Sequence, residues 1–334
     1  MLERRYNILR TIQNHQPIGR RLLAEKLKVG ERTIRSEIEF LKEKQILAPD
    51  QAGVYLTPES QRNLVELGHL VHKLRGLTQL EKWLAERLGI RKVLIIPGDL
   101  ASDPTVFREL GKLAGRFIVD AIKENRILAV TGGTTMAEVA HSIPRVSGYN
   151  KTLVVPGRGG LGEDVEIQAN TIAAAIAQRL GATYRLLHIP DNVSSETLTE
   201  LLTDHKVAEV LSLSKKANVF MHGIGVPQEM TLRRDLNWQQ ILHASAKQPV
   251  GEALGSYFAA DGSVVTTSLT VGPKLDDLAE MELVIAVAGG SNKGKAILAV
   301  IKNGFDHVLI TDEGAARVIR EELSGLPLTV DRLP

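Results

Sequence analysis

The stretch Ala129-Val-Thr-Gly-Gly-Thr-Thr-Met136 is the most informative part of this sequence. An apolar run, Arg126 to Val130, stops there at a glycine pair, and a helical pattern, Met136 to His141, follows it. This order predicts a β-strand that turns through the glycines into a helix N-terminus. Free backbone N–H groups, the positive end of the helix dipole and two threonine hydroxyls would then point at one spot. We expect an oxyanion to bind there, most often a phosphate.

Short apolar runs and helical patterns alternate on both sides of this stretch, from residue 91 to the C-terminus. This alternation predicts an α/β fold with a doubly wound, mostly parallel sheet, whose ligands lie at the carboxyl ends of the strands. The expected strands are 92–96, 127–131, 153–155, 185–189, 218–221, 283–288 and 308–311. The expected helices are 105–124, 136–141, 168–180, 292–302 and 312–323.

Polar or glycine-rich loops follow four of these strands. Arg158 lies in Pro156-Gly-Arg-Gly-Gly160, where its guanidinium could fork onto a phosphate, and Lys293 lies in the first turn after a second glycine pair. The fourth loop, His222 to Val226, is rich in glycine and has no cation. The bland alternative is that glycine pairs only turn the chain. The candidate ligand residues here are Gly132, Gly133, Thr134, Thr135, Arg158, Asn292 and Lys293, with Glu252 as an acceptor for sugar hydroxyls.

The first 56 residues show three short helical patterns followed by a hairpin pattern. The helices are expected at 1–15, 20–27, where Leu22, Leu23 and Leu27 would be buried, and 31–44. The strands 45–48 and 54–56 would pair across 49–53 as a wing. This order is typical of a winged helix-turn-helix. The turn has Lys28 where glycine is usual, and the third helix begins at Gly30, an acceptable N-cap in place of serine.

The exposed face of the third helix carries two arginines beside short hydroxyl side chains, a combination that can reach base edges and phosphates. The candidate DNA contacts are Arg32, Thr33, Arg35, Ser36 and Lys42. Residues 1–76 contain 14 Lys and Arg against 9 Asp and Glu, whereas the remaining residues contain 27 against 30. A basic head on a slightly acidic body fits a nucleic-acid contact and equally a chance asymmetry of surface charge. The basic exposed face of the third helix, followed by the wing, favours DNA binding over a module for protein contact.

Residues 57–90 are expected to form linker helices between the head and the body. Thr57-Pro58-Glu59 is a helix start, and Leu64, Leu67, Val71 and Leu74 step by three, four and three. This seam could pair two subunits or pack on its own chain. His69 and His72 lack the spacing of a metal site and are interpreted as surface residues.

The composition is that of a globular protein with two domains, with 43% hydrophobic and 24% charged residues in 334. No apolar run reaches the ~18 residues of a membrane helix, and no signal peptide is expected. The absence of cysteine excludes disulfides and thiolate metal sites. We therefore expect a cytoplasmic protein without a bound metal or cofactor.

Taken whole, the chain resembles the sorbitol-operon-regulator (SorC) family of bacterial repressors. The resemblance rests on 23–41 in the head, the Gly-Gly-Thr-Thr loop, 156–164, Gln-Ala-Asn-Thr-Ile at 168–172 and Gly-Gly-Ser-Asn-Lys-Gly-Lys at 289–295. It implies a winged helix-turn-helix over 1–56, a linker over 57–90, and a body over 91–334 that is similar to sugar-phosphate isomerases and deaminases. It also implies that Thr134, Thr135, Arg158 and Lys293 contact phosphate, Glu252 sugar hydroxyls, and Gln168 the other end of the ligand.

The resemblance further implies repression of a glycolytic gene cluster from operator DNA, with fructose 1,6-bisphosphate as inducer. We expect a homodimer, with a tetramer on DNA, whose subunit contacts are rearranged by the ligand. Two alternatives remain open: a sister repressor that senses another sugar phosphate such as a deoxyribose phosphate, and an isomerase or deaminase with a DNA-binding appendage. The enzyme is disfavoured, because the loop at 222–229 lacks the Asp-Gly-His of the deaminases, leaving no catalytic residues to assign.

Overall fold

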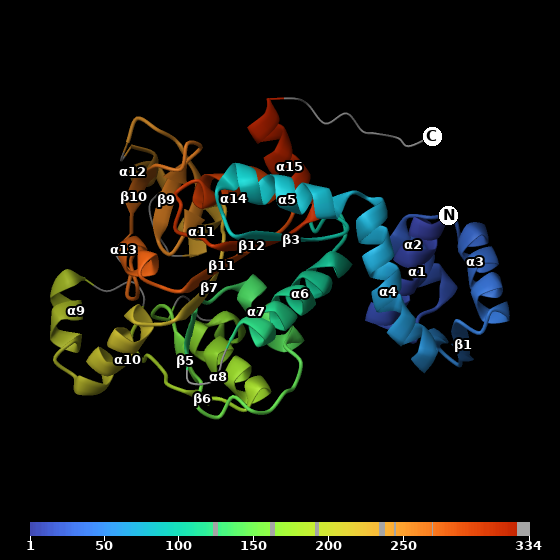
Figure 1. Ribbon diagram of the computed structural model, residues 1–334, viewed down its shortest axis with the longest axis horizontal. Helices are drawn as coiled ribbons and strands as arrows, with labels where there is room; N and C mark the ends of the chain where they lie inside the picture. Colours follow the sequence, from blue (N-terminus) through green and yellow to red (C-terminus); the bar gives the residue numbers. More distant parts are fainter. Residues whose placement is uncertain are drawn as a thin grey trace. The chain divides into compact units, whose positions relative to one another are not determined.

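The computed structural model describes residues 1–122, 126–160, 164–190, 194–233, 238–243, 245–268 and 270–325 (Figure 1). The chain divides into two compact units, Met1–Thr78 and Gln79–Pro334. Three parts of the sequence predictions lie outside the described residues. They are the end of the helix expected at 105–124, positions 161–163 of the motif at 156–164, and the end of the body beyond 325.

The first unit begins with α1 (Leu2–His15), α2 (Arg20–Leu27) and α3 (Glu31–Glu43), which enclose a core that includes Ile8, Leu23 and Ile34. Leu22 was expected to be buried but is 47% exposed, because α2 turns Leu23 and Ala24 into this core. Leu27, also expected to be buried, is half-buried and packs against the same core. Lys28 ends α2 in the left-handed conformation, with φ 51° and ψ 39°. The turn therefore keeps the geometry that glycine usually supplies.

The wing is a two-stranded antiparallel hairpin of β1 (Leu47–Asp50) and β2 (Gly53–Leu56). Its loop is Gln51-Ala52 alone, shorter than the five residues expected, because Pro49 and Asp50 pair with Val54 and Gly53. Val54 also exchanges two backbone hydrogen bonds with Ile18. The wing is thus attached to the turn between α1 and α2.

The helix expected as a linker, α4 (Pro58–Leu74), is part of the first compact unit and packs against α1. Thr57 caps it by accepting a hydrogen bond from the Ser60 backbone N–H. Leu64 and Val71 of the expected seam are buried in the core of the head, and Leu67 packs against the same core. Leu74 is 56% exposed, and Leu70 beside it is also exposed. Most of the seam therefore stabilises its own chain.

The second unit is built on a seven-stranded sheet in the order β3-β12-β11-β7-β4-β5-β6, with every neighbouring pair parallel. Its strands are β3 (Lys92–Ile96), β4 (Ile127–Val130), β5 (Leu153–Pro156), β6 (Thr183–Tyr184), β7 (Val219–Gly223), β11 (Leu283–Val287) and β12 (Val308–Asp312). Successive strands run outward from β4 to β6, and then from β7 to β12 in the other direction. The predicted doubly wound α/β fold is confirmed, and its switch point lies between β4 and β7.

Three helices, α6 (Thr105–Ala121), α7 (Thr134–Ser142) and α8 (Ala169–Leu180), share one buried core with the central strands. α6 and α7 pack closely, because Gly111 and Gly115 leave space for Glu138 and Ile143. Figure 1 shows α14 (Gly294–Ile301) and α15 (Glu313–Ser324) on the opposite side of β12 and β3 from α6. The sheet is thus covered on both faces, as its nearly continuous apolar strands require.

A smaller antiparallel sheet, which the sequence patterns did not predict, packs on α14. It contains β8 (Pro249–Ala253), β9 (Ser256–Ala259) and β10 (Val264–Thr267). The strand expected at 185–189 is absent, because the chain pairs with β5 only through β6. The other elements are α5 (Leu77–Leu88), η1 (Val165–Ile167), α9 (Ser195–Leu201), α10 (His205–Lys215), α11 (Pro227–Arg233), α12 (Trp238–His243), α13 (Leu275–Ala279) and η2 (Ser291–Lys293).

Candidate functional site

A cavity of about 80 Å³ lies at the carboxyl ends of β4 and β7, the switch point of the sheet. Loops that follow four different strands meet there, together with β8. Seven of the nine residues predicted to hold a ligand line this cavity: Gly132, Gly133, Thr134, Thr135, Arg158, Glu252 and Lys293. Residues as far apart in the sequence as Gly132 and Lys293 are therefore brought to one place, as the fold class predicts.

The loop after β4 has the conformation of a helix N-terminus. Gly133 is the N-cap of α7 with φ 112°, a value that favours glycine, and it supplies no capping side chain. Gly132 is required for a different reason, since a Cβ there would lie 2.7 Å from the carbonyl oxygen of Ile167. The first turn of α7, Thr134 to Met136, therefore presents N–H groups that have no partner within the helix.

The second glycine pair has a different role from the first. Gly290 (φ 103°) and Ser291 direct their backbone N–H groups to protein carboxylates: Gly290 donates to Asp312 Oδ2 at 2.8 Å, and Ser291 to Asp99 Oδ1 at 2.9 Å. Asp312 also accepts from Leu100 and Ala315. These bonds fix the loop, whose Lys293 side chain lines the cavity.

Groups of both charges line the cavity. Arg158 follows β5 and is 9% exposed, whereas Glu252 is a buried residue of β8 whose Oε1 accepts a hydrogen bond from the Gly255 backbone at 2.8 Å. Gly225 and Glu252 exchange backbone hydrogen bonds of 2.9 and 3.0 Å, which join the small sheet to the loop after β7. A ligand with an anionic end and hydroxyls would find both cations and a carboxylate acceptor in this lining.

Two predicted residues, Gln168 and Asn292, are outside the lining. Gln168 is the N-cap of α8 and half-buried, and Asn292 is exposed. Conversely, sequence reasoning did not single out the following lining residues: Thr131, Gly223, Ile224, Gly225, Glu229, Met230 and Leu254. The glycine-rich loop at 222–226 was the available signal, but nothing in the sequence paired it with 252–254.

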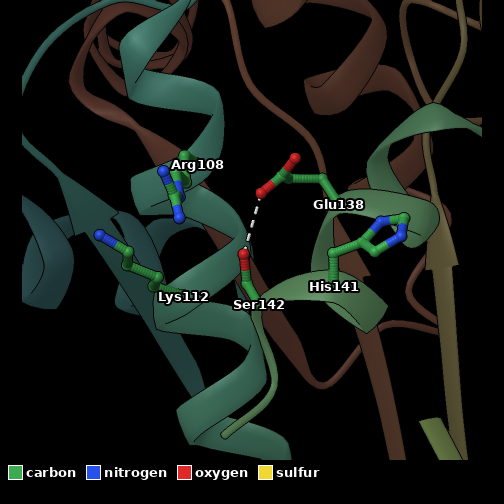
Figure 2. A pocket seen from close by; sticks show the side chains of 5 residues that line it. All are labelled: Arg108, Lys112, Glu138, His141 and Ser142. Carbon is green, nitrogen blue, oxygen red and sulfur yellow. Dashed lines mark hydrogen bonds between the residues drawn. The ribbon is translucent and has the colours of Figure 1, made fainter. Parts of the chain in front are cut away.

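A second and larger cavity, of about 460 Å³, lies between α6 and α7 (Figure 2). Arg108 and Lys112 line it from α6, and Glu138, His141 and Ser142 from α7. Lys112 is already paired with Glu109 at 2.8 Å, and Glu138 accepts a hydrogen bond from Ser142. We place the functional site at the smaller cavity, because it combines the helix N-terminus, two cations and the switch point of the sheet.

His222 is not available as a catalytic base, because it is completely buried and both ring nitrogens are engaged. Within the described part of the cavity lining, the carboxylates are Glu229 and Glu252, and no histidine is present. No group of three metal-ligating side chains occurs among the described residues. Over the same ranges, every helix is too short or too polar to cross a membrane.

The predicted DNA face of α3 is open to solvent. Arg32, Arg35, Ser36 and Lys42 are exposed and Thr33 is half-buried. Arg35 donates to Glu39 at 2.9 Å, one turn further along the helix. The buried side of α3 is held by Glu37, which pairs with Arg4 and Arg5 of α1 at 2.7 and 2.8 Å.

Comparison with protein families gives two matches that together cover most of the chain. The sugar-binding domain family (Sugar-bind) matches residues 72–320, and the CggR N-terminal DNA binding domain matches residues 1–71. The division between the two families falls within four residues of the end of α4.

Among characterised proteins, the chain is 40% identical to the central glycolytic genes regulator of Bacillus subtilis, over 96% of this chain and 95% of that protein. It is 41% identical to the protein of the same name in Priestia megaterium, over 95% and 93%. The deoxyribonucleoside regulator of B. subtilis is 23% identical, over 90% and 92%.

Two solved structures show the same architecture. A SorC family transcriptional regulator from Enterococcus faecalis is 36% identical, with a TM-score of 0.67 over 72% of this chain and 99% of that one. The full-length sorbitol operon regulator of Klebsiella pneumoniae shares the fold at 16% identity, with a TM-score of 0.65 over 95% and 98%. The chain belongs to the SorC family of transcriptional regulators, with an N-terminal DNA-binding domain followed by a sugar-binding domain.

Proposed function

We propose that this protein represses glycolytic genes by binding operator DNA, and that fructose 1,6-bisphosphate is its inducer. The names of the relatives from B. subtilis and P. megaterium support the class of genes. The gathering of Thr134, Arg158, Glu252 and Lys293 around one cavity is the observation that supports a phosphorylated sugar.

The size of the cavity indicates how a ligand would lie. Sites that enclose a whole small molecule usually measure about 300–1,000 Å³, whereas this cavity measures about 80 Å³. We infer that the described lining holds one phosphate, at the α7 N-terminus, with adjoining hydroxyls at Glu252. The second phosphate would then lie toward the cavity mouth, the side on which we keep Gln168 as a proposed contact.

The two functions are proposed to meet at the contact between subunits. The exposed face of α3 would contact the major groove, with one head of a homodimer on each half-site and two dimers on one operator. A ligand shifts an equilibrium only by binding one state more tightly than the other. A bisphosphate would do so through its second phosphate, loosening the subunit arrangement that grips DNA.

A titration on an operator fragment tests this proposal. Fluorescence anisotropy of the complex should change with fructose 1,6-bisphosphate and respond far less to fructose 6-phosphate. The double variant Thr134→Ala/Arg158→Ala should bind operator normally and lose the response. Arg35→Ala should weaken operator binding and keep ligand binding. An operator complex insensitive to every sugar phosphate would refute the proposal.

The second candidate function is that of a sister repressor that senses another sugar phosphate, such as a deoxyribose phosphate. The similarity to a deoxyribonucleoside regulator favours it. A thermal-shift panel that includes deoxyribose phosphates separates it from the first. We propose that the protein is not an enzyme and needs neither metal nor cofactor. Isomerase and deaminase assays on the same sugar phosphates should therefore show no turnover.

A further inference from the structure

His222 is a buried ionisable residue directly beneath the candidate site. It lies near the end of β7, next to Gly223, which lines the cavity. The rings of Phe220 and Phe305 flank it, with centroids 6.1 and 5.7 Å away. Its side chain and that of Asp306 are both fully buried. Burying an ionisable pair costs free energy, so its presence here calls for an explanation.

The hydrogen bonds of His222 determine its protonation state. Nδ1 lies 3.0 Å from the carbonyl oxygen of Gly223, and Nε2 lies 2.8 Å from Oδ1 of Asp306. A carbonyl oxygen and a carboxylate both accept hydrogen bonds, so opposite a carboxylate each ring nitrogen carries a proton. A histidine with two N–H groups is an imidazolium cation. The geometry therefore favours a buried positive charge.

The surrounding charges balance this cation. Asp306, just before β12, faces it directly, and Oδ2 of Asp306 has no hydrogen-bond partner among the described residues. Glu252 of β8 acts on it from the cavity side. Burial lowers the pKa of His222, but the charges of Asp306 and Glu252 and the hydrogen bonds outweigh burial, and the pKa is raised. The charged form is therefore the favoured one.

The cation is connected to the ligand site through the backbone. It holds the carbonyl of Gly223, two residues before Gly225, and Gly225 in turn pairs with the backbone of Glu252. The position of Glu252 at the cavity therefore depends on the turn that His222 holds.

We infer that His222 is a positioning residue that stays protonated in the folded protein. It fixes the turn after β7, and this turn holds the backbone of Glu252, the proposed acceptor for ligand hydroxyls. The charge state follows from the fold alone. The consequence for ligand binding rests on the proposed function.

The charge state is tested by NMR on the full-length protein labelled with ¹⁵N-histidine. His222 is identified by its contacts to Phe220 and Phe305, and at pH 8 both ring nitrogens should show the chemical shifts of protonated nitrogen. The variant Asp306→Asn should make the ring neutral at that pH. A neutral ring in the unaltered protein at pH 8 would overturn the inference, as would a proton residing on Asp306.

The positioning role is tested by calorimetry with fructose 1,6-bisphosphate. His222→Gln should raise Kd by at least about tenfold, the loss expected for a charge-assisted hydrogen bond. His141→Gln, the same change at an exposed residue outside this cavity, should leave Kd unaltered. If His222→Gln misfolds, Asp306→Asn serves in its place. If a folded variant that has lost the ring charge binds with unchanged affinity, the positioning role is refuted. If the unaltered protein itself does not bind fructose 1,6-bisphosphate, the proposed effector is refuted and the NMR result still stands.

Discussion

Replacing Lys293 by methionine should weaken the binding of fructose 1,6-bisphosphate by about 10- to 40-fold. The ammonium group lines the cavity, and a hydrogen bond to a charged group contributes about 1.5–3 kcal/mol, with each 1.4 kcal/mol worth tenfold in Kd. Lys293 is half-buried, so solvent screens part of its charge, and the lower half of that range applies. The loop itself should not move, because Asp99 and Asp312 hold its backbone.

Lys295→Met is the matched control. Lys295 is two residues further along, its side chain is 68% exposed, and it pairs with Glu322 at 3.1 Å, outside the cavity. Calorimetry should give the control the affinity of the unaltered protein, and operator binding should be intact in both variants. If Lys293→Met binds as tightly as the control, Lys293 does not contact the phosphate and the assignment of this loop is wrong.

Three further predictions concern the fold. Burial raises the pKa of Glu37, but the hydrogen bonds and charges of Arg5 and Arg4 outweigh burial, and the pKa is lowered. The Glu37 carboxylate therefore stabilises the head at pH values above its ordinary pKa of about 4.3. This stabilisation is lost as the pH falls through the lowered pKa. Circular dichroism between pH 6 and 2 should show acid unfolding that is less steep in Glu37→Gln. Gly132→Ala should lower the melting temperature and abolish ligand binding, since its Cβ would meet the Ile167 carbonyl. Gly30→Ala has open space around it and should cost only about 0.5–1 kcal/mol, because alanine is a poorer N-cap than glycine. Leu64→Ala should cost about 2–4 kcal/mol of unfolding free energy, because Leu64 is buried; Leu74→Glu should cost little and, if α4 pairs two subunits, should shift sedimentation from dimer to monomer.

The parts of the fold that could be predicted are those whose signals are local. The strand–glycine–helix order at 127–142 and the three helices of the head are each encoded within about 15 residues, by periodicity and by glycine or proline at their ends. Lys28 shows the limit of such signals, since tertiary context holds a lysine in the left-handed conformation.

The parts that could not be predicted depend on partners far away in the sequence. Nothing near Gly251 indicates that β8 packs on α14, where a Cβ at Gly251 would lie 2.5 Å from the carbonyl oxygen of Ala296. From the sequence alone, the N–H groups of Gly290 and Ser291 suggest an anion site. In the structure they donate instead to the carboxylates of Asp312 and Asp99. The apolar seam on α4 could either pair two subunits or pack on its own chain, because the spacing of apolar residues does not show which surface covers them.

The single carboxylate of Asp312 has consequences for how relatives of this protein can diverge. It caps α15 and also holds the backbone at Leu100 and at Gly290, in the loop that carries Lys293, so a substitution there would damage folding and sensing together. Genetic screens for folded regulators that no longer respond to their signal should therefore rarely recover substitutions of Asp312. New specificities are expected to arise by exchange of side chains such as Lys293 on an unchanged frame.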